Sequence, residues 1–78
     1  MLANHSFVLR AEWSDGSQEL VTKFGPKNRD LALKFARRYA KVDNVTKVWV
    51  NRELPGSDDA YLVGTFLSDG TETLEPTL

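Results

Sequence analysis

The residues that could perform catalysis are few in this chain of 78 residues. His5 is the only histidine, and it lies close to the amino terminus, where we expect the chain to be mobile. A nucleophilic serine needs an ordered imidazole whose orientation is fixed by a carboxylate. Ser6, Ser14 and Ser17 are better explained as strand and turn residues. The sequence therefore predicts a protein that is not an enzyme.

Metal and cofactor sites have equally little support. Asp58 and Asp59 place two carboxylates in a loop, but the ligand spacing of a calcium-binding loop is missing. The chain has no cysteine, which excludes thiolate-bound zinc, iron–sulfur clusters and disulfides. Residues 25–28, Gly-Pro-Lys-Asn, precede a predicted helix and form a weakly specific candidate site for an anion. We predict no cofactor and no metal.

Basic residues are concentrated in the middle of the chain, although the net charge is only −1. Nine of the ten lysines and arginines lie between Lys23 and Arg52, together with two acidic residues. Such asymmetry is typical of a surface for nucleic acid or for an acidic partner. It also arises when a helix has a basic solvent face for solubility, and we favour this interpretation. Nucleic-acid binding is the alternative function, through Lys27, Lys34, Arg37, Arg38 and Lys41.

Two hairpins with nearly the same turn are predicted near the two ends of the chain. Apolar residues alternate with others in residues 7–13, as in a half-buried strand. Asp15-Gly16 favours a hairpin turn, and the second strand ends at Gly25-Pro26. The segment Trp13-Ser14-Asp15-Gly16 recurs later as Leu67-Ser68-Asp69-Gly70. Convergence on favourable turn chemistry explains this repeat as well as duplication does.

The register of the first hairpin depends on the length of its loop. A two-residue loop pairs Trp13 with Gln18 and keeps one face of the hairpin mostly apolar. A three-residue loop places Glu19 opposite Ala11 and mixes the faces, so we prefer the two-residue loop. Its weak point is that Glu12 then lies opposite Glu19, a pair of like charges.

A helix is predicted over residues 28–41. Asn28 is the favoured cap, and Gly25 followed by Pro26 at the first helical position is the alternative. Apolar residues recur at helical spacing, which predicts that this side of the helix faces a sheet. They are Leu31, Ala32, Phe35, Ala36, Tyr39 and Ala40.

Three more strands complete the predicted fold, at 45–54, at 60–67 and within 71–78. The crossover through the helix is right-handed, so the first strand fits between the second and the third. The expected fold is α+β, with one helix on one face of an antiparallel sheet of order 2-1-3-4-5. We expect a single domain over residues 1–78, with mobile ends at 1–5 and 75–78.

A helix about 21 Å long covers only the middle of one face of a sheet ~20 Å wide. Strict alternation along the strands assigns to the helix side Phe7, Leu9, Ala11, Trp13, Leu20, Phe24, Val48, Val50, Tyr61, Val63, Leu67 and Leu74. It assigns to the reverse side Val8, Val21, Val45, Trp49, Leu62 and Phe66, among Arg10, Lys23 and Lys47. A contiguous apolar patch on a small protein usually marks a partner surface.

The predicted partner surface on the reverse side consists of Trp49, Leu62, Phe66, Val8 and Val21. Pairing two sheets back to back would form a homodimer and enlarge the small core that a chain of this length builds. The alternative for Trp49 is that it lies partly buried over lysine and arginine stems, without a partner. We predict a non-enzymatic protein-interaction module that binds itself and a further protein.

The expected location is cytoplasmic. The amino-terminal segment has no long apolar run, and no segment approaches the ~20 apolar residues of a membrane span. The lack of cysteine also fits a reducing compartment.

Three segments resemble small uncharacterised proteins of actinobacteria and their phages. They are residues 12–17 with the sequence Glu-Trp-Ser-Asp-Gly-Ser, residues 35–38 with Phe-Ala-Arg-Arg, and residues 43–50. The resemblance covers roughly residues 7–52, and the hairpin at 60–78 is not part of it. It supplies no catalytic residues. It implies an accessory protein that binds and modulates a host protein, in the host cytoplasm if a phage encodes it.

Overall fold

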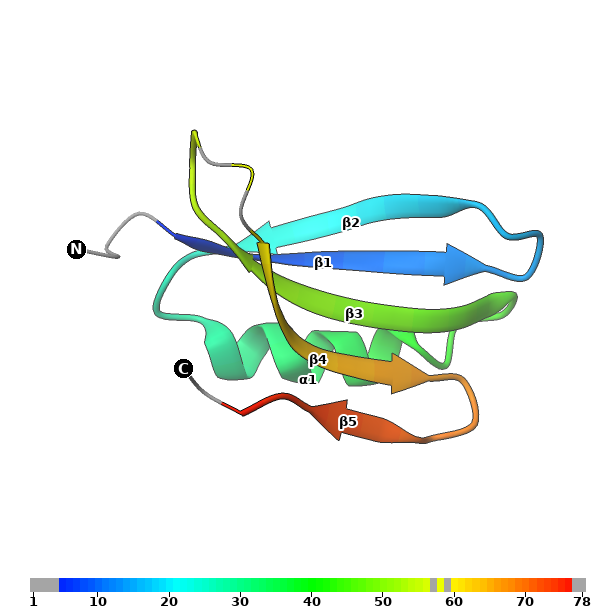
Figure 1. Ribbon diagram of the computed structural model, residues 1–78. Helices are drawn as coiled ribbons and strands as arrows, with labels where there is room; N and C mark the ends of the chain where they lie inside the picture. Colours follow the sequence, from blue (N-terminus) through cyan, green and yellow to red (C-terminus); the bar gives the residue numbers. More distant parts are fainter. Residues whose placement is uncertain (1–4, 57, 59, 77–78) are drawn as a thin grey trace.

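The computed structural model describes residues 5–56, 58 and 60–76. Within them lie β1 (Ser6–Trp13), β2 (Gln18–Phe24), α1 (Arg29–Tyr39), β3 (Val45–Glu53), β4 (Ala60–Leu67) and β5 (Glu72–Leu74). Neighbouring strands pair antiparallel in the order β2-β1-β3-β4-β5, and α1 lies against one face of the sheet (Figure 1). The predicted α+β fold and strand order are therefore confirmed. No helix of the described residues has the length and apolar character to cross a membrane.

The core lies between α1 and the sheet. Its buried residues are Phe7, Leu9, Ala11, Ala32, Leu33, Ala36, Ala40, Val45, Val48, Val50 and Phe66. Ala32 and Ala36 of α1 and Ala40 at its carboxyl-terminal cap recur once per turn and point at the sheet, with Leu33 beside them. Leu31 and Phe35, which we predicted to face the sheet, are 51% and 41% exposed. The prediction was wrong for these two residues because the alanines, and not the bulky side chains, lie at the middle of the buried side of the helix.

The helix is shorter than the predicted range of 28–41. It begins at Arg29, and Asn28 occupies the cap position without a capping hydrogen bond from its side chain. Pro26 lies in the preceding turn, where the N–H of Asn28 donates to the carbonyl of Gly25 at 3.1 Å. The alternative that begins the helix at Pro26 is therefore wrong. Asn44, with a φ of 71°, lies immediately before β3.

Both hairpins end in the same three-residue turn. In the first, the N–H of Trp13 donates to the carbonyl of Ser17 and the N–H of Gly16 donates to the carbonyl of Trp13, both at 2.8 Å. The same two bonds recur within residues 67–71, at 2.9 and 3.1 Å. Each turn needs a positive φ, 88° at Gly16 and 95° at Gly70, which glycine adopts without steric cost. The preferred two-residue loop is therefore wrong, and the repeat in the sequence is a repeat in the structure.

An aspartate stabilises each turn. Oδ1 of Asp15 accepts hydrogen bonds from the hydroxyl and the N–H of Ser17, at 2.6 and 2.9 Å. Oδ1 of Asp69 accepts from the N–H of Thr71 at 2.9 Å. Hydrogen bonds from the side chain and then the backbone of Ser17 and Thr71 lower the pKa of both aspartates below the ordinary 3.8.

With the observed three-residue loop, Glu12 does not lie opposite Glu19, so the predicted pair of like charges does not form. Gln18, rather than Glu19, lies opposite Glu12, and its Nε2 donates to Oε1 of Glu12 at 3.0 Å. Glu19 lies opposite Ala11, on the helix side of the sheet.

Three β-bulges decide which way the strands face. Val21 in β2, Thr46 in β3 and Val63 in β4 are extra residues that the pairing of their neighbours skips. An extra residue reverses the alternation of the strand beyond it. The predicted facing is therefore right on one side of each bulge and wrong on the other.

Several predicted positions are corrected by these bulges. Phe66 and Val45, expected on the reverse side, are buried in the helix-side core, and Val21 packs against that core. Leu20 and Leu67, expected on the helix side, lie opposite Arg10 and Lys47 and point away from the helix.

Candidate functional site

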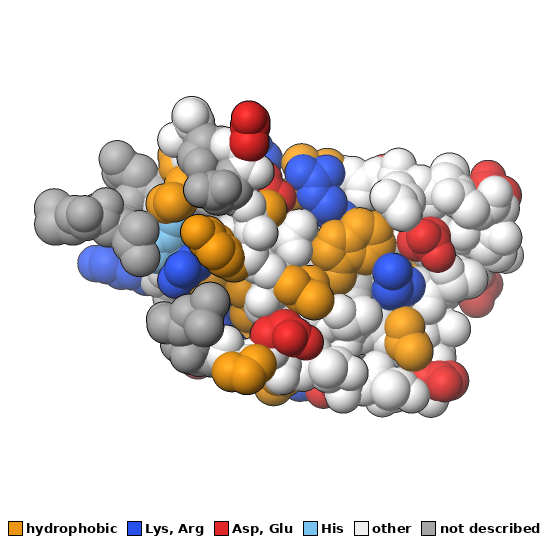
Figure 2. Space-filling model, in the orientation of Figure 1, with side chains coloured by type: hydrophobic (Ala, Val, Ile, Leu, Met, Phe, Trp, Pro, Cys, Tyr) orange, Lys and Arg blue, Asp and Glu red, His pale blue; other side chains and the backbone are white. Residues whose placement is uncertain are grey.

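Side chains that point away from α1 form the open face of the sheet. The strand pairing assigns to it Val8, Arg10 and Glu12 of β1, Leu20 and Lys23 of β2, Lys47, Trp49, Asn51 and Glu53 of β3, and Leu62, Thr65 and Leu67 of β4. Trp49 lies near the centre, between Arg10 and Thr65 on the neighbouring strands. Figure 2 views the molecule from this side and shows apolar side chains interspersed with charged ones.

Trp49 is partly buried on the open face. Nζ of Lys47 lies 5.0 Å from the centroid of a Trp49 ring, a distance at which the ring attracts the ammonium group. Arg10 lies opposite Trp49 and forms an ion pair of 3.4 Å with Glu53. Leu20 lies on the other side of Arg10 and is 43% exposed. Apolar surface therefore remains accessible on both sides of a basic side chain.

The predicted partner surface is assembled only in part. Trp49 and Leu62 both lie on the open face, and Leu62 is 44% exposed. Val8 faces the same way but is 1% exposed, so it offers little surface to a partner. Phe66 and Val21 lie on the helix side. The cluster of Trp49, Leu62 and Phe66 that the sequence predicted does not form.

A second surface lies where α1 borders β2. Four rings form an aromatic row, with centroids 5.8 Å apart from Phe24 to Phe35, 6.1 Å from Phe35 to Tyr39 and 6.3 Å from Tyr39 to Trp13. The sequence reasoning missed this surface, because it placed the bulky residues of α1 in the core. The signal that could have revealed it is the competing series of alanines, which recurs at the same spacing.

Glu19 fixes one end of the aromatic row. Its Oε1 accepts hydrogen bonds from Nε1 of Trp13 at 3.0 Å and from the hydroxyl of Tyr39 at 3.5 Å. Burial, and next the charge of Glu19, raise the pKa of Tyr39 above the ordinary 10.0. The phenol therefore stays protonated at neutral pH and remains a donor to Glu19.

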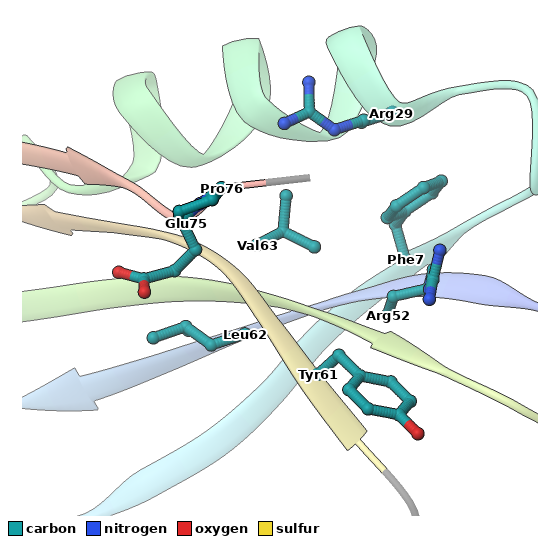
Figure 3. A pocket seen from close by; sticks show the side chains of 8 residues that line it. All are labelled: Phe7, Arg29, Arg52, Tyr61, Leu62, Val63, Glu75 and Pro76. Carbon is teal, nitrogen blue, oxygen red and sulfur yellow. The ribbon is translucent and has the colours of Figure 1, made fainter. Parts of the chain in front are cut away.

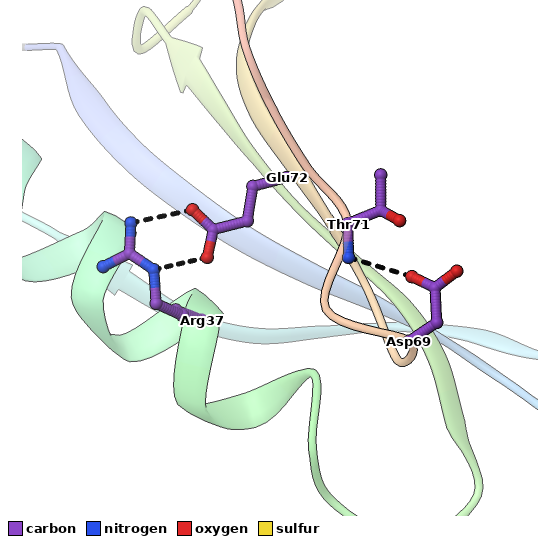
Figure 4. A network of polar contacts seen from close by, with 4 residues as sticks. All are labelled: Arg37, Asp69, Thr71 and Glu72. Atoms are coloured by element: carbon purple, nitrogen blue, oxygen red, sulfur yellow. Dashed lines mark hydrogen bonds and ion pairs between the residues drawn. The ribbon is translucent and has the colours of Figure 1, made fainter.

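The five basic residues predicted for nucleic acid are not equivalent. Arg37 donates to both carboxylate oxygens of Glu72, at 2.7 and 3.0 Å (Figure 4), and its guanidinium carbon lies 5.7 Å from the ring centroid of Phe66. The guanidinium group of Arg37 is therefore occupied by contacts within the chain. Among the described residues, no carboxylate lies within ion-pair distance of the other four, which are Lys27, Lys34, Arg38 and Lys41.

A pocket of about 90 Å³ lies between the start of α1, the end of β3, the start of β4 and the segment after β5 (Figure 3). The guanidinium carbon of Arg52 lies 5.5 Å from the ring centroid of Tyr61 beside it. Sites for small molecules usually measure ~300–1,000 Å³. The pocket therefore suits a single side chain better than a substrate. Its lining consists of Phe7, Arg29, Arg52, Tyr61, Leu62, Val63, Glu75 and Pro76.

The residues considered for catalysis or metal binding form no metal-binding cluster among the described residues. His5 contacts Phe7 edge to face, with ring centroids 5.3 Å apart. Asp58 is exposed, and Asp59 lies outside the described residues. In the part of the chain that the structure describes, no three potential ligands among His, Cys, Asp and Glu gather around a metal-sized space.

No protein-family model, no curated protein and no solved structure matches this chain.

Proposed function

We propose that this protein is a non-enzymatic interaction module that forms a homodimer through the open face and binds a further protein. The observation that carries the proposal is the position of Trp49, on a face of the sheet that α1 does not cover. Leu20 and Leu62 are more than two-fifths exposed on the same face. Apolar surface gathered on one face of a small protein usually marks a partner surface.

The size of the open face limits the affinity of such a dimer. Four strands of seven to nine residues, at ~3.3 Å per residue and ~4.8 Å spacing, make a face of about 25 by 20 Å. Two such faces together bury ~1,000 Å², near the lower end of specific interfaces. We therefore expect a transient dimer rather than a permanent one.

The charges on the open face are mixed, which suits the pairing of two identical surfaces. Arg10, Lys23 and Lys47 are basic, and Glu12 and Glu53 are acidic. A two-fold axis places each face against its copy. Cations of one protomer then have acids of the other within reach, which favours one orientation of the two sheets.

Sedimentation velocity over a range of protein concentrations tests the dimer. The wild-type protein is expected to gain mass as its concentration rises. Trp49→Asp is expected to remain a monomer, because it would bury an unpaired charge at the centre of the interface. Lys34→Asp, on the helix side, is the matched control and leaves the association unchanged. A wild-type protein that stays monomeric at every concentration rules out the dimer.

For the further partner we propose a protein of an actinobacterial host, met in the cytoplasm. The support is the resemblance of residues 12–17, 35–38 and 43–50 to small uncharacterised proteins of actinobacteria and their phages, which implies an accessory role. Affinity capture from an actinobacterial lysate tests this proposal, with quantitative mass spectrometry of the retained proteins. A host protein enriched by the wild type but not by an unrelated domain of equal size and charge supports it. Equal retention by both contradicts it.

Nucleic-acid binding is the second candidate function. The four exposed cations before, on and after α1 favour it, whereas the contacts of Arg37 with Glu72 remove one member of the predicted set. Phosphate contacts make such binding strongly dependent on salt. Retention of a labelled single-stranded oligonucleotide at low salt, lost in Lys34→Glu with Arg38→Glu, would support this candidate. No retention at low salt excludes it.

A further inference from the structure

The outer side of α1 carries apolar residues where a surface helix is normally polar. Leu31, Lys34, Phe35 and Arg38 follow the spacing i, i+3, i+4 and i+7, so they share one side of the helix. That side lies away from the alanines that face the sheet. Leu31 is 51% exposed and Phe35 is 41% exposed. We call these four residues the helix ridge.

Phe35 is oriented by other rings rather than by burial. It stacks on Tyr39 with an angle of 18° between the ring planes, and it contacts Phe24 from the side. The hydrogen bond from Tyr39 to Glu19 fixes the far end of this row. An exposed aromatic side chain with a fixed orientation loses little conformational entropy on binding, which is typical of an anchor residue in an interface.

The two cations of the helix ridge are uncompensated within the described chain. Lys34 and Arg38 are one helical turn apart, a rise of ~6 Å, and no described carboxylate lies within ion-pair distance of either. The neighbouring Arg37 shows the contrast, because it is bound by both oxygens of Glu72. The ridge therefore combines exposed apolar surface with positive charge.

We propose that the helix ridge binds an acidic amphipathic helix of another protein. Apolar side chains of that helix would cover Leu31 and Phe35, and two of its carboxylates, one turn apart, would pair with Lys34 and Arg38. From Leu31 to Tyr39 the helix rises ~12 Å. About two to three turns of a partner helix are enough to span this length.

One end of the ridge disfavours more extended anions. Glu19 lies there beside Tyr39 and forms no ion pair with a described residue. Its carboxylate repels a membrane surface or a phosphate backbone that continues past the ridge. At the other end, the exposed carboxylate of Asp30 lies 3.8 Å from Nη1 of Arg29, which offsets its charge. A second copy of this chain is also a poor occupant, because Lys34 and Arg38 of the two copies would face each other and repel.

The helix ridge and the open face lie on opposite sides of the sheet, so the two proposals can fail separately. Trp49→Asp, which would disrupt the dimer, is expected to leave peptide binding at the ridge unchanged. Lys34→Glu with Arg38→Glu is expected to leave the dimer unchanged and to weaken peptide binding.

Selection from a phage-displayed library of random peptides of ~16 residues, long enough for about four helical turns, tests the inference. The immobilised wild-type protein is expected to enrich peptides with Leu or Phe at helical spacing and with Glu or Asp three or four positions apart. Enrichment of basic peptides, or no enrichment at all, overturns the proposal.

Synthetic versions of the enriched peptides then measure the role of the ridge by fluorescence anisotropy. Lys34→Glu with Arg38→Glu, and separately Leu31→Gln with Phe35→Gln, are each expected to weaken binding at least about tenfold. Lys47→Glu, on the open face, is the control and changes affinity less than about twofold. Thermal melts confirm that each variant is folded. Unchanged affinity in the double charge reversal overturns the proposal, as does tighter binding of an oligonucleotide or of anionic vesicles through the same residues.

Discussion

Arg37 of α1 donates two hydrogen bonds to the carboxylate of Glu72 in β5, at 2.7 and 3.0 Å, across a separation of 35 residues. β5 has only three residues and pairs with β4 alone. The ion pair therefore joins the last strand to the helix directly, rather than through the sheet. It also places the guanidinium group over Phe66, which belongs to the buried core.

The first prediction concerns the titration of Glu72. The hydrogen bonds from Arg37 lower its pKa below the ordinary 4.5. Because the pKa is lower in the folded state, this contact supports the fold above the ordinary pKa and is lost as the pH falls through the lowered value. Carbon-detected NMR should therefore show Glu72 titrating below 4.5. Arg37→Gln should move its midpoint back toward that value, and an unmoved midpoint contradicts the assignment.

The second prediction concerns the two glycines at positive φ. Gly16→Ala and Gly70→Ala should each destabilise the protein by about 1–2 kcal/mol, because an added Cβ disfavours this backbone conformation. No atom lies within 4 Å of the added Cβ at either position, so the loss of stability comes from the backbone conformation alone. Urea denaturation measures the change. Gly25→Ala is the matched control: Gly25 has no positive φ, its added Cβ meets Asn28 at an ordinary 3.8 Å, and the change should be neutral or stabilising. Equal losses at all three glycines contradict this explanation.

The third prediction separates the two faces of β4. Phe66→Ala should cost about 3–5 kcal/mol, because it removes a fully buried ring beneath α1. Leu62→Ala, which lies closer to the start of β4 and is 44% exposed, should cost less than half as much. Chemical denaturation compares the two variants. If Phe66→Ala does not fold, Phe66→Leu provides the measurement, with an expected cost of about 1.5 kcal/mol or less. A larger loss for Leu62→Ala than for Phe66→Ala would contradict the placement of Phe66 in the core beneath α1.

The fourth prediction concerns the close packing at Gly64. A Cβ there would lie 2.9 Å from Cδ2 of Leu74 and 3.4 Å from Cδ2 of Leu33. Gly64→Ala should therefore destabilise the protein by about 1 kcal/mol, through displacement of Leu74 and loosening of β5. Combining it with Leu74→Ala removes the closest obstructing atom, Cδ2 of Leu74. The double variant should be more stable than the sum of the two single losses, by at least about 0.5 kcal/mol. Strict additivity would show that the two residues do not touch.

The strand order could be predicted because its signals are local. Alternation in residues 7–13, the two Asp-Gly turns and the position of the helix leave few arrangements for a small antiparallel sheet. The bulges at Val21 and Thr46 could not be predicted, because both are ordinary β-branched strand residues without a glycine or proline beside them. At Val63 the adjacent Gly64 is a signal that the sequence reasoning missed. Each bulge reverses the facing of the residues beyond it. The predicted partner surface therefore lost Phe66 and gained Leu20.

The surface beside α1 was missed for a different reason. Two apolar series with the same helical spacing run along α1, one of alanines and one that contains Leu31 and Phe35. Periodicity alone does not say which series faces the sheet. The alanines face the sheet because their small side chains allow the helix to lie close to β1 and β3. The larger residues remain outside, where they are available to a partner.

The bulge at Val21 has a consequence for how the sheet meets other molecules. β2 is an outer strand, and a residue out of step at its middle prevents another extended chain from continuing a regular ladder along it. On the opposite border, β5 ends after three residues and Pro76 follows, which has no N–H to donate. Both borders are thus ill suited to templating fibres. Association is directed instead to side-chain surfaces, where charge and shape discriminate among partners.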